Sequence, residues 1–127
     1  VETIPKFHDG QLNLGCVLMR TNRLAEAIER FQILLQDHPQ SFLAYRNMGL
    51  CYAHMRNFHL ANHCLEKAIE VFPNYTDAKL DLATLKLHSQ KLEAARTIVM
   101  EALTSDPKNQ RGQAILGEID RIQAQRI

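Results

Sequence analysis

Evenly spaced prolines are the feature that most constrains this chain. It has only four, and the same interval separates each from the next: Pro5, Pro39, Pro73 and Pro107. Small residues keep this interval in two further series, namely Gly15, Gly49, Ala83 and Gly117, and then Ala27, Ala61 and Ala95. Several independent positions that share one period indicate a structural repeat of about 34 residues.

Aligned on this period, the chain consists of three units, 8–41, 42–75 and 76–109, and a partial unit, 110–127. Apolar residues within each unit recur at spacings of three and four, which is typical of one face of a helix. Polar turns at 21–23, 56–57 and 89–91 interrupt this pattern. We therefore predict helices at 8–20, 24–37, 41–54, 58–71, 75–88, 92–104 and 109–125, with Ser41 and Asn109 as N-caps.

The pattern resembles the tetratricopeptide repeat (TPR) family. The residues that carry the resemblance are Leu14, Gly15, Ala27, Phe31 and Pro39 in the first unit, Gly49, Tyr52, Ala61, Ala68 and Pro73 in the second, and Leu82, Ala95, Ala102 and Pro107 in the third. Tyr45 replaces the usual tryptophan, and Lys79 and Lys86 depart from the expected aromatic residues. The resemblance implies an all-α, right-handed α-α superhelix, a TPR solenoid of three full helix-turn-helix repeats plus a C-terminal helix, as a single domain over residues 1–127.

The small residues indicate close packing of two helices within each repeat. We expect Gly15 and Gly49 to let the second helix approach the first, with Ala27 and Ala61 facing them. Larger apolar residues should fill the spaces between the pairs, namely Leu14, Phe31, Tyr52 and Leu65. One pair cannot bury its own apolar face, so stability should come from stacking on neighbouring pairs.

Both ends of the chain suggest a piece of a longer array. Pro5 is in phase with the other prolines, so residues 1–7 are interpreted as the tail of a preceding repeat. Segment 110–127 has apolar residues at helical spacing and is either a capping helix or the first half of another repeat.

Charge and composition give little reason to expect some classes of partner. Lys and Arg total 15 and Asp and Glu total 14, so a formal charge of +1 gives no electrostatic reason to expect nucleic acid or an anionic membrane. No apolar run approaches the ~20 residues that a membrane-spanning helix needs. Pro5, His8 and Asp9 interrupt any apolar core near the start, so we expect these residues not to be a secretory signal. The three cysteines, Cys16, Cys51 and Cys64, form no C-x-x-C pair, which favours a reducing compartment and a cytoplasmic location.

In the TPR family, the first helices of the repeats line a concave groove that binds a peptide or a partner's helix. Carried over by position, this groove is apolar with a few polar groups, a composition suited to an amphipathic segment. The residues are Leu12, Asn13, Cys16, Met19 and Arg20 from the first repeat, Leu43, Arg46, Asn47, Leu50, Ala53 and His54 from the second, and Asp77, Leu80, Asp81, Thr84, Leu87 and His88 from the third.

One column of this groove holds Asn13, Asn47 and Asp81. In some members of the family an asparagine ladder at this column bonds the backbone of an extended peptide, because an amide both donates and accepts. The alternative is that Asn before Leu-Gly is simply common in the repeat. Asp81 interrupts the ladder and is suited to a basic side chain.

The family's clamp for chaperone tails grips a C-terminal carboxylate with lysines, asparagines and an arginine. The matching positions here hold Leu12, Cys16, Asn47, Asp77 and Asp81. Only Asn47 fits, and the two aspartates would repel a carboxylate. We therefore expect no binding to chaperone C-terminal tails.

Catalytic and metal signals are absent from the sequence. There is no glycine-rich phosphate loop and no motif that arranges Ser, His and Asp, so we expect no enzymatic activity and no cofactor. His59 and His63 are four residues apart, but no third ligand is assured, and solvent-facing histidines are the simpler interpretation. His54 and His88, at the ends of first helices, either favour the helix dipole when protonated or contact a partner in a pH-sensitive way.

The sequence thus predicts a protein-interaction scaffold whose groove holds a peptide or an amphipathic helix of another protein. Two alternatives remain open. The segment could be a substrate-recruiting or regulatory arm of a larger enzyme, or a scaffold that self-assembles through its terminal repeats into a homo-oligomer.

Overall fold

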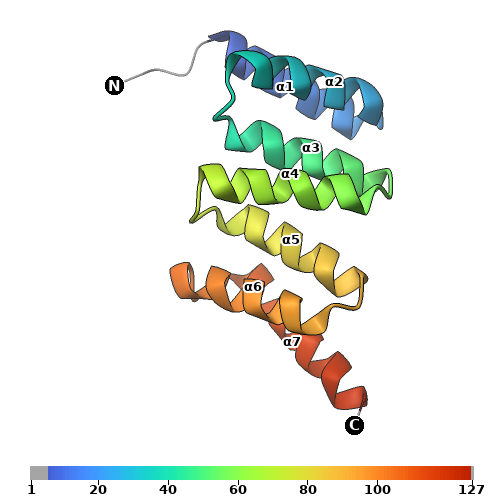
Figure 1. Cartoon of the computed structure of the whole chain (residues 1–127), viewed down its shortest axis with the longest axis vertical. Coiled ribbons are helices and arrows are strands. Elements are labelled where there is room, and N and C mark those ends of the chain that lie inside the picture. The colour runs from blue at the N-terminus through green and yellow to red at the C-terminus, as the bar shows by residue number, and fades with distance from the viewer. Residues whose placement is uncertain (1–5, 127) are drawn as a thin grey trace. The chain divides into compact units, whose positions relative to one another are not determined.

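Helices make up most of the chain that the structure describes. The computed structural model describes residues 6–126, which contain no strand. The helices are α1 (Lys6–Arg20), α2 (Leu24–Asp37), α3 (Phe42–His54), α4 (Phe58–Val71), α5 (Thr76–His88), α6 (Leu92–Ser105) and α7 (Gln110–Gln125) (Figure 1). The predicted all-α fold class is confirmed. The interpretation of residues 1–5 as the end of a preceding repeat lies outside the described residues, whereas residues 6 and 7 belong to α1.

The helix ends agree with the predicted ends to within two residues, and the caps explain two of the differences. Ser41 accepts a hydrogen bond from the Ala44 N–H at 3.3 Å, and Asn109 accepts one from the Gly112 N–H at 2.8 Å. Both residues are therefore N-caps that precede α3 and α7 rather than their first helical residues.

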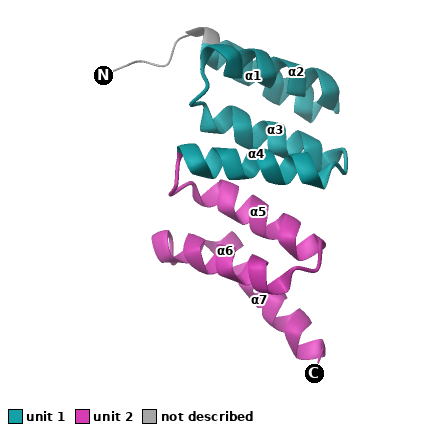
Figure 2. Ribbon diagram, viewed as in Figure 1, with its two compact units in different colours: residues 1–71 teal, residues 72–127 magenta. Residues whose placement is uncertain are grey.

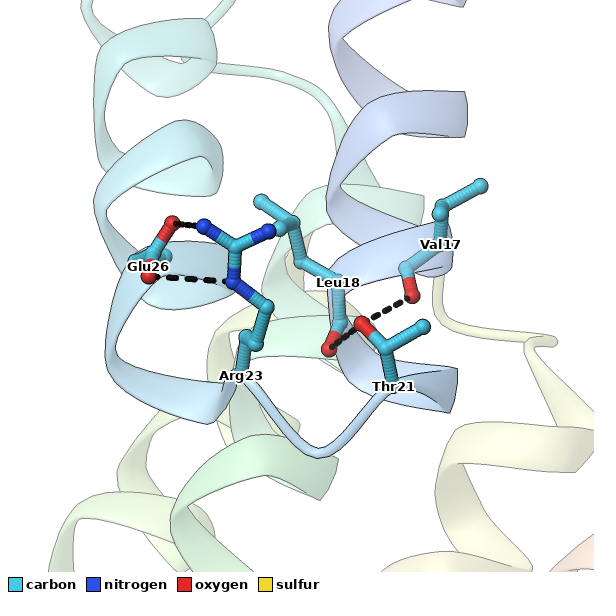
Figure 3. A network of polar contacts seen from close by, with 5 residues as sticks. All are labelled: Val17, Leu18, Thr21, Arg23 and Glu26. Atoms are coloured by element: carbon cyan, nitrogen blue, oxygen red, sulfur yellow. Dashed lines mark hydrogen bonds and ion pairs between the residues drawn. The ribbon is translucent and has the colours of Figure 1, made fainter.

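The turn inside each helix pair has the same backbone geometry. Asn22, Arg56 and Gln90, which are again one repeat interval apart, have φ values of 62°, 63° and 61°. One left-handed residue stops a helix and reverses the chain, and asparagine is well suited to this conformation, whereas arginine and glutamine adopt it at some cost. In the first turn, the Thr21 hydroxyl donates to the carbonyls of Val17 and Leu18, and Arg23 pairs with Glu26 at 2.6 Å (Figure 3).

The chain divides into two compact units (Figure 2). Unit 1 is residues 1–71 and contains α1 to α4, and unit 2 is residues 72–127 and contains α5 to α7. The expectation of one continuous domain over residues 1–127 stays a prediction.

The core of unit 1 is an apolar cluster shared by its helices. The stripe of α2 that meets it consists of Ala27, Ile28, Phe31 and Leu34, at the helical spacing that the sequence predicted. Ala44, Met48 and Cys51 contribute from α3, Leu18 from α1 and Cys64 from α4. The Phe31 and Leu34 side chains are fully buried. The second helix α2 therefore packs on both α1 and α3, as stacking of repeats requires.

The three helices of unit 2 meet in an apolar cluster. It consists of Ala83 from α5, Ala95 and Val99 from α6 and Ile119 from α7, all fully buried. Leu87, Ile98, Leu103, Ile115 and Leu116 pack around it. The apolar side of α7 is therefore its attachment to the helices of this unit.

Two of the repeat glycines lie where a side chain would collide. A Cβ atom at Gly15 would lie 2.4 Å from the Phe31 ring, and one at Gly49 would lie 3.2 Å from the Ala61 carbonyl oxygen. The predicted close approach of paired helices is present at both positions, although Phe31 rather than Ala27 is the close neighbour of Gly15. At Gly117 a Cβ atom would meet nothing within 4 Å, so this glycine marks no close approach of two helices.

One predicted core residue is not in the core. Leu14 is 39 % exposed, whereas Phe31 and Leu65 are buried and Tyr52 is partly buried against the unit 1 cluster. The prediction that Leu14 fills a space between helix pairs is therefore wrong. Leu14 lies away from the side of α1 that Gly15 presents to α2, about one-quarter of a helical turn around the axis.

Candidate functional site

The candidate residues of unit 1 lie on α1 and α3, which are neighbours within this unit. The residues below form what we call the α1–α3 face. Most are partly exposed, so one part of each side chain packs against the protein and the rest reaches solvent. The partly exposed residues are Leu12, Cys16 and Met19 on α1 and Leu43, Arg46, Asn47, Leu50 and Ala53 on α3, and the exposed ones are Asn13, Arg20 and His54.

A side-chain contact ties the two helices of this face together. The Asn47 amide donates to the Cys16 sulfur at 3.6 Å. Two donor hydrogens and the acceptor oxygen give an asparagine amide more capacity than this one weak bond uses. Asn47 is therefore positioned by the fold while its carbonyl oxygen retains capacity for a peptide N–H.

The candidate residues of unit 2 are less available than the sequence predicted. Leu80 is fully buried, and Asp81 is only 5 % exposed. Alanines and leucines at 78, 80, 82, 83 and 85 are buried as well, so α5 is enclosed around most of its circumference. The prediction that Leu80 lines an accessible groove is wrong, and Leu80→Glu would bury a charge rather than test a surface.

Asp81 receives a basic side chain from its own chain. The Arg111 guanidinium of α7 bonds the Asp81 carboxylate at 2.7 Å. The prediction that this carboxylate suits a basic group is thus met by Arg111, within unit 2. Among the remaining candidates of α5, Asp77 and His88 are exposed, Thr84 and Leu87 are partly exposed, and the Thr84 hydroxyl donates to the Leu80 carbonyl at 2.8 Å.

Sequence reasoning missed the polar attachment of α7 to α6. Arg96 donates to Asp120 at 2.5 Å and also to the Gln123 side chain, which in turn donates to Glu93 at 2.8 Å. Next to this network the first turn of α6 and the end of α7 border an open cleft of about 730 Å³, lined by Gln90, Lys91, Leu92, Glu93, Ala94, Gln123 and Arg126. Both features depend on how α7 crosses α6, which no local pattern reveals.

The cysteines are placed as small apolar residues. All three are free thiols; Cys51 and Cys64 are buried and Cys16 is partly exposed. Burial raises the pKa of Cys64 from 9.0 to about 11. Burial and, to a smaller extent, the nearby Cys16 and Cys64 thiols raise the pKa of Cys51 from 9.0 to about 11. Both buried thiols are therefore protonated at neutral pH and are poor nucleophiles.

The histidine pair on α4 faces solvent. His59 and His63 are both exposed. Within the described residues, no group of three or more His, Cys, Asp or Glu side chains is placed to hold a metal ion. In the same part of the chain, none of the helices combines the length and the apolar character that crossing a bilayer demands.

Comparison with known proteins shows which family shares this arrangement of helices. Two family models described as tetratricopeptide repeat match residues 52–119 and 12–56. DnaJ homolog subfamily C member 3 of Bos taurus is 29 % identical over 96 residues, which cover 76 % of this chain and 19 % of that protein. Hsp70-Hsp90 organizing protein 3 of Arabidopsis thaliana is 23 % identical over 106 residues, which cover 84 % of this chain and 19 % of that protein. The chain thus spans about a fifth of the length of these relatives.

Solved structures agree on the fold. The first TPR domain of Spaghetti (RPAP3), solved bound to the HSP90 peptide SRMEEVD, superimposes with a TM-score of 0.87 at 19 % identity and covers 98 % of both chains. The TPR domain of P58(IPK) superimposes with a TM-score of 0.82 at 26 % identity and covers 94 % of this chain and 34 % of its own. On the helix pairs, their regular interval and these matches, the chain belongs to the tetratricopeptide repeat family.

Proposed function

We propose that this chain is a protein-interaction module that holds a peptide or an amphipathic helix of another protein on the first helices of its repeats. The observation that carries the proposal is the α1–α3 face. It offers partly exposed apolar side chains, Leu12, Met19, Leu43 and Leu50, around the positioned amide of Asn47. Apolar contacts supply affinity for a peptide's side chains, and an amide supplies register along its backbone.

The asparagine column supports a narrower interaction than a ladder across all repeats. Asn13 is exposed and Asn47 is partly exposed, whereas Asp81 is buried and bonded to Arg111. We propose that backbone recognition is confined to the two asparagines of unit 1. A peptide that bonds both asparagines through its backbone is locally extended, because the backbone groups of a helical segment already form hydrogen bonds within the helix.

A protein partner also fits the charge of the chain. A formal charge of +1 gives little attraction for a polyanion, so we propose that nucleic acid is not bound. Free thiols at Cys16, Cys51 and Cys64 suit a reducing compartment such as the cytoplasm.

The test begins with selection of peptides from a random display library on the purified chain. The enriched peptide is then titrated into the wild type, Leu50→Glu and the matched control His63→Glu, which adds the same charge to an exposed position on α4. We expect Leu50→Glu to weaken binding at least about tenfold, which corresponds to ~1.4 kcal/mol, and the control to bind as the wild type does. Equal binding by a folded Leu50→Glu variant, or the absence of any enriched peptide, would contradict the proposal.

Chaperone tails provide a specificity test. The peptide SRMEEVD, to which the Spaghetti (RPAP3) domain was solved bound, carries three acidic residues. Here the clamp positions include the exposed carboxylate of Asp77 and the apolar Leu12, so we propose that this chain does not bind it. Fluorescence anisotropy with the labelled peptide should show no saturable signal, with the Spaghetti (RPAP3) domain as the positive control. Saturable binding that Leu50→Glu abolishes would show that the clamp argument is wrong while the peptide-binding face is right.

A further inference from the structure

The outer side of α1 has an apolar stripe that is exposed. Leu14 is 39 % and Val17 is 44 % exposed, and at Gly10 an added Cβ atom would meet nothing within 4 Å. The three residues are four and three positions apart, so they lie on one line along the helix. We call this line the α1 stripe.

The same positions in other first helices are covered by a helix. In α3, one repeat later, they hold Ala44, Met48 and Cys51, all buried in the cluster that α2 shares. In α7, three repeats after α1, they hold Gly112, Leu116 and Ile119, which pack on unit 2, with Leu103 of α6 against the glycine. The α1 stripe thus has the composition and register of a surface on which a helix packs.

Opposite charges flank the two ends of the stripe. Asp9 and Arg20 are eleven residues apart, which is about three helical turns, so they lie above one another on the same flank. The Asp9 side chain is 59 % exposed and lies 3.5 Å from His8 Nδ1, and Arg20 is exposed. Arg23, the next cation along the chain, already pairs with Glu26 (Figure 3).

We propose that the occupant of the α1 stripe is α1 of a second copy of this chain, packed antiparallel about a two-fold axis close to Leu14. Such an axis places the two Leu14 side chains together and sets Gly10 opposite Val17 of the partner subunit, where the glycine leaves room for a branched side chain. It also places Asp9 beside Arg20 of the partner subunit, and this happens twice because the axis repeats every contact. Gly10, Leu14 and Val17 do not belong to the α1–α3 face, although Arg20 on their flank does. The Leu14→Glu variant therefore tests this inference without altering that face.

The contact is small, because it uses one helix of four turns from each copy. We therefore expect a reversible dimer with a dissociation constant on the order of 100 µM, as weak interfaces below about 1,200 Å² give. Two exposed ion pairs contribute, so association should weaken as salt rises from about 50 mM to about 500 mM.

Charge reversal tests the arrangement without touching the apolar stripe. Asp9→Arg places Arg opposite Arg at both ends, and Arg20→Asp places Asp opposite Asp, so sedimentation velocity on the 127-residue chain from about 10 µM to 1 mM should show each variant at least tenfold weaker than the wild type. An equimolar mixture of the two variants should associate again, because every cross-copy pair in the mixed dimer is attractive. Circular dichroism spectra of both variants establish that the fold is intact, since either change also acts on the helix dipole.

Apolar variants provide the second arm. Leu14→Glu should abolish association, whereas Met100→Ser, at a more exposed apolar position on α6, should leave it unchanged. A wild type that stays monomeric at 1 mM, a mixture of charge variants that does not associate, or a dimer that survives Leu14→Glu would each overturn the inference.

Discussion

The first and last helices of the chain differ at equivalent positions of the repeat. The stripe of Gly10, Leu14 and Val17 on α1 is exposed, whereas Gly112, Leu116 and Ile119 on α7 pack against unit 2. Similar residues therefore have opposite burial, because α6 packs on the α7 stripe and no helix of the described residues covers the one on α1. In an array of repeats, burial depends on which neighbour is present as much as on residue type.

The same two helices also differ on the side where a paired helix packs. The Phe31 ring occupies the space where a side chain at Gly15 of α1 would lie. Gly117, at the equivalent position of α7, faces open space. Around Gly117 the outward residues Gln113, Ala114 and Arg121 are small or polar. The two interpretations of segment 110–127, a capping helix and the first half of another repeat, both stay predictions.

The largest expected effect compares the two stripes directly. Ile119→Ala removes a fully buried side chain and should cost roughly 2–5 kcal/mol of unfolding free energy. Val17→Ala truncates a side chain that is 44 % exposed and should cost less than about 1 kcal/mol. Urea unfolding monitored by circular dichroism measures both. Equal losses would mean that the two stripes are equally buried in solution.

Paired glycine substitutions should have opposite signs. Gly15→Ala brings a methyl group within 2.4 Å of the buried Phe31 ring and should destabilise by roughly 1–2 kcal/mol after the gain in helix propensity. Gly117→Ala adds a methyl group to open space inside a helix and should stabilise by about 0.5–1 kcal/mol. Thermal unfolding of both variants shows whether each change raises or lowers the melting temperature. Stabilisation by Gly15→Ala would contradict the packing described for unit 1.

A third comparison asks how much the polar attachment of α7 contributes. Arg111→Met removes the guanidinium that bonds the buried Asp81 carboxylate and should cost about 1 kcal/mol, since the arginine side chain is itself 43 % exposed. The control is Arg121→Met, whose ion pair with Glu118 lies within α7 and should contribute no more than about 0.5 kcal/mol. Hydrogen exchange should show faster opening of α7 in the first variant only. Unchanged exchange in Arg111→Met would assign the attachment of α7 to Ile119 and its apolar neighbours.

The last comparison concerns alkaline pH and belongs to unit 1. The pKa of Cys51 rises from 9.0 to about 11 in the folded protein, so the unfolded chain loses its thiol proton first as pH increases. Stability should therefore be independent of this thiol below pH 9 and fall between about pH 9 and pH 11. Cys51→Ala should reduce that fall, and Cys16→Ala, at a partly exposed position, is the matched control. An equal fall in the wild type and Cys51→Ala would assign the alkaline loss to other groups.

The helices, turns and caps could be predicted because local residues determine them. The repeat interval located every pair, and Ser41 and Asn109 were recognisable as caps from their side chains. The close approach at Gly15 and Gly49 followed from residue size.

The accessibility of the candidate site could not be predicted to the same extent. Leu80 and Asp81 share repeat positions with Arg46 and Asn47, yet the first pair is buried and the second is partly exposed. The partner of Asp81, Arg111, is 30 residues away on another helix. Such contacts depend on tertiary packing. The periodic pattern predicts which helices are neighbours, but it does not predict which of their side chains meet.

The most direct test of the central claim is the mapping of a bound peptide onto the helices. The ¹⁵N-labelled chain is titrated with the peptide selected by display, and amide chemical-shift changes are followed residue by residue. We predict that the largest changes fall on α1 and α3, around Asn13, Asn47 and Leu50, and that α2 and α4 change little. Changes centred on the second helices or on the turns would contradict a binding surface formed by the first helices.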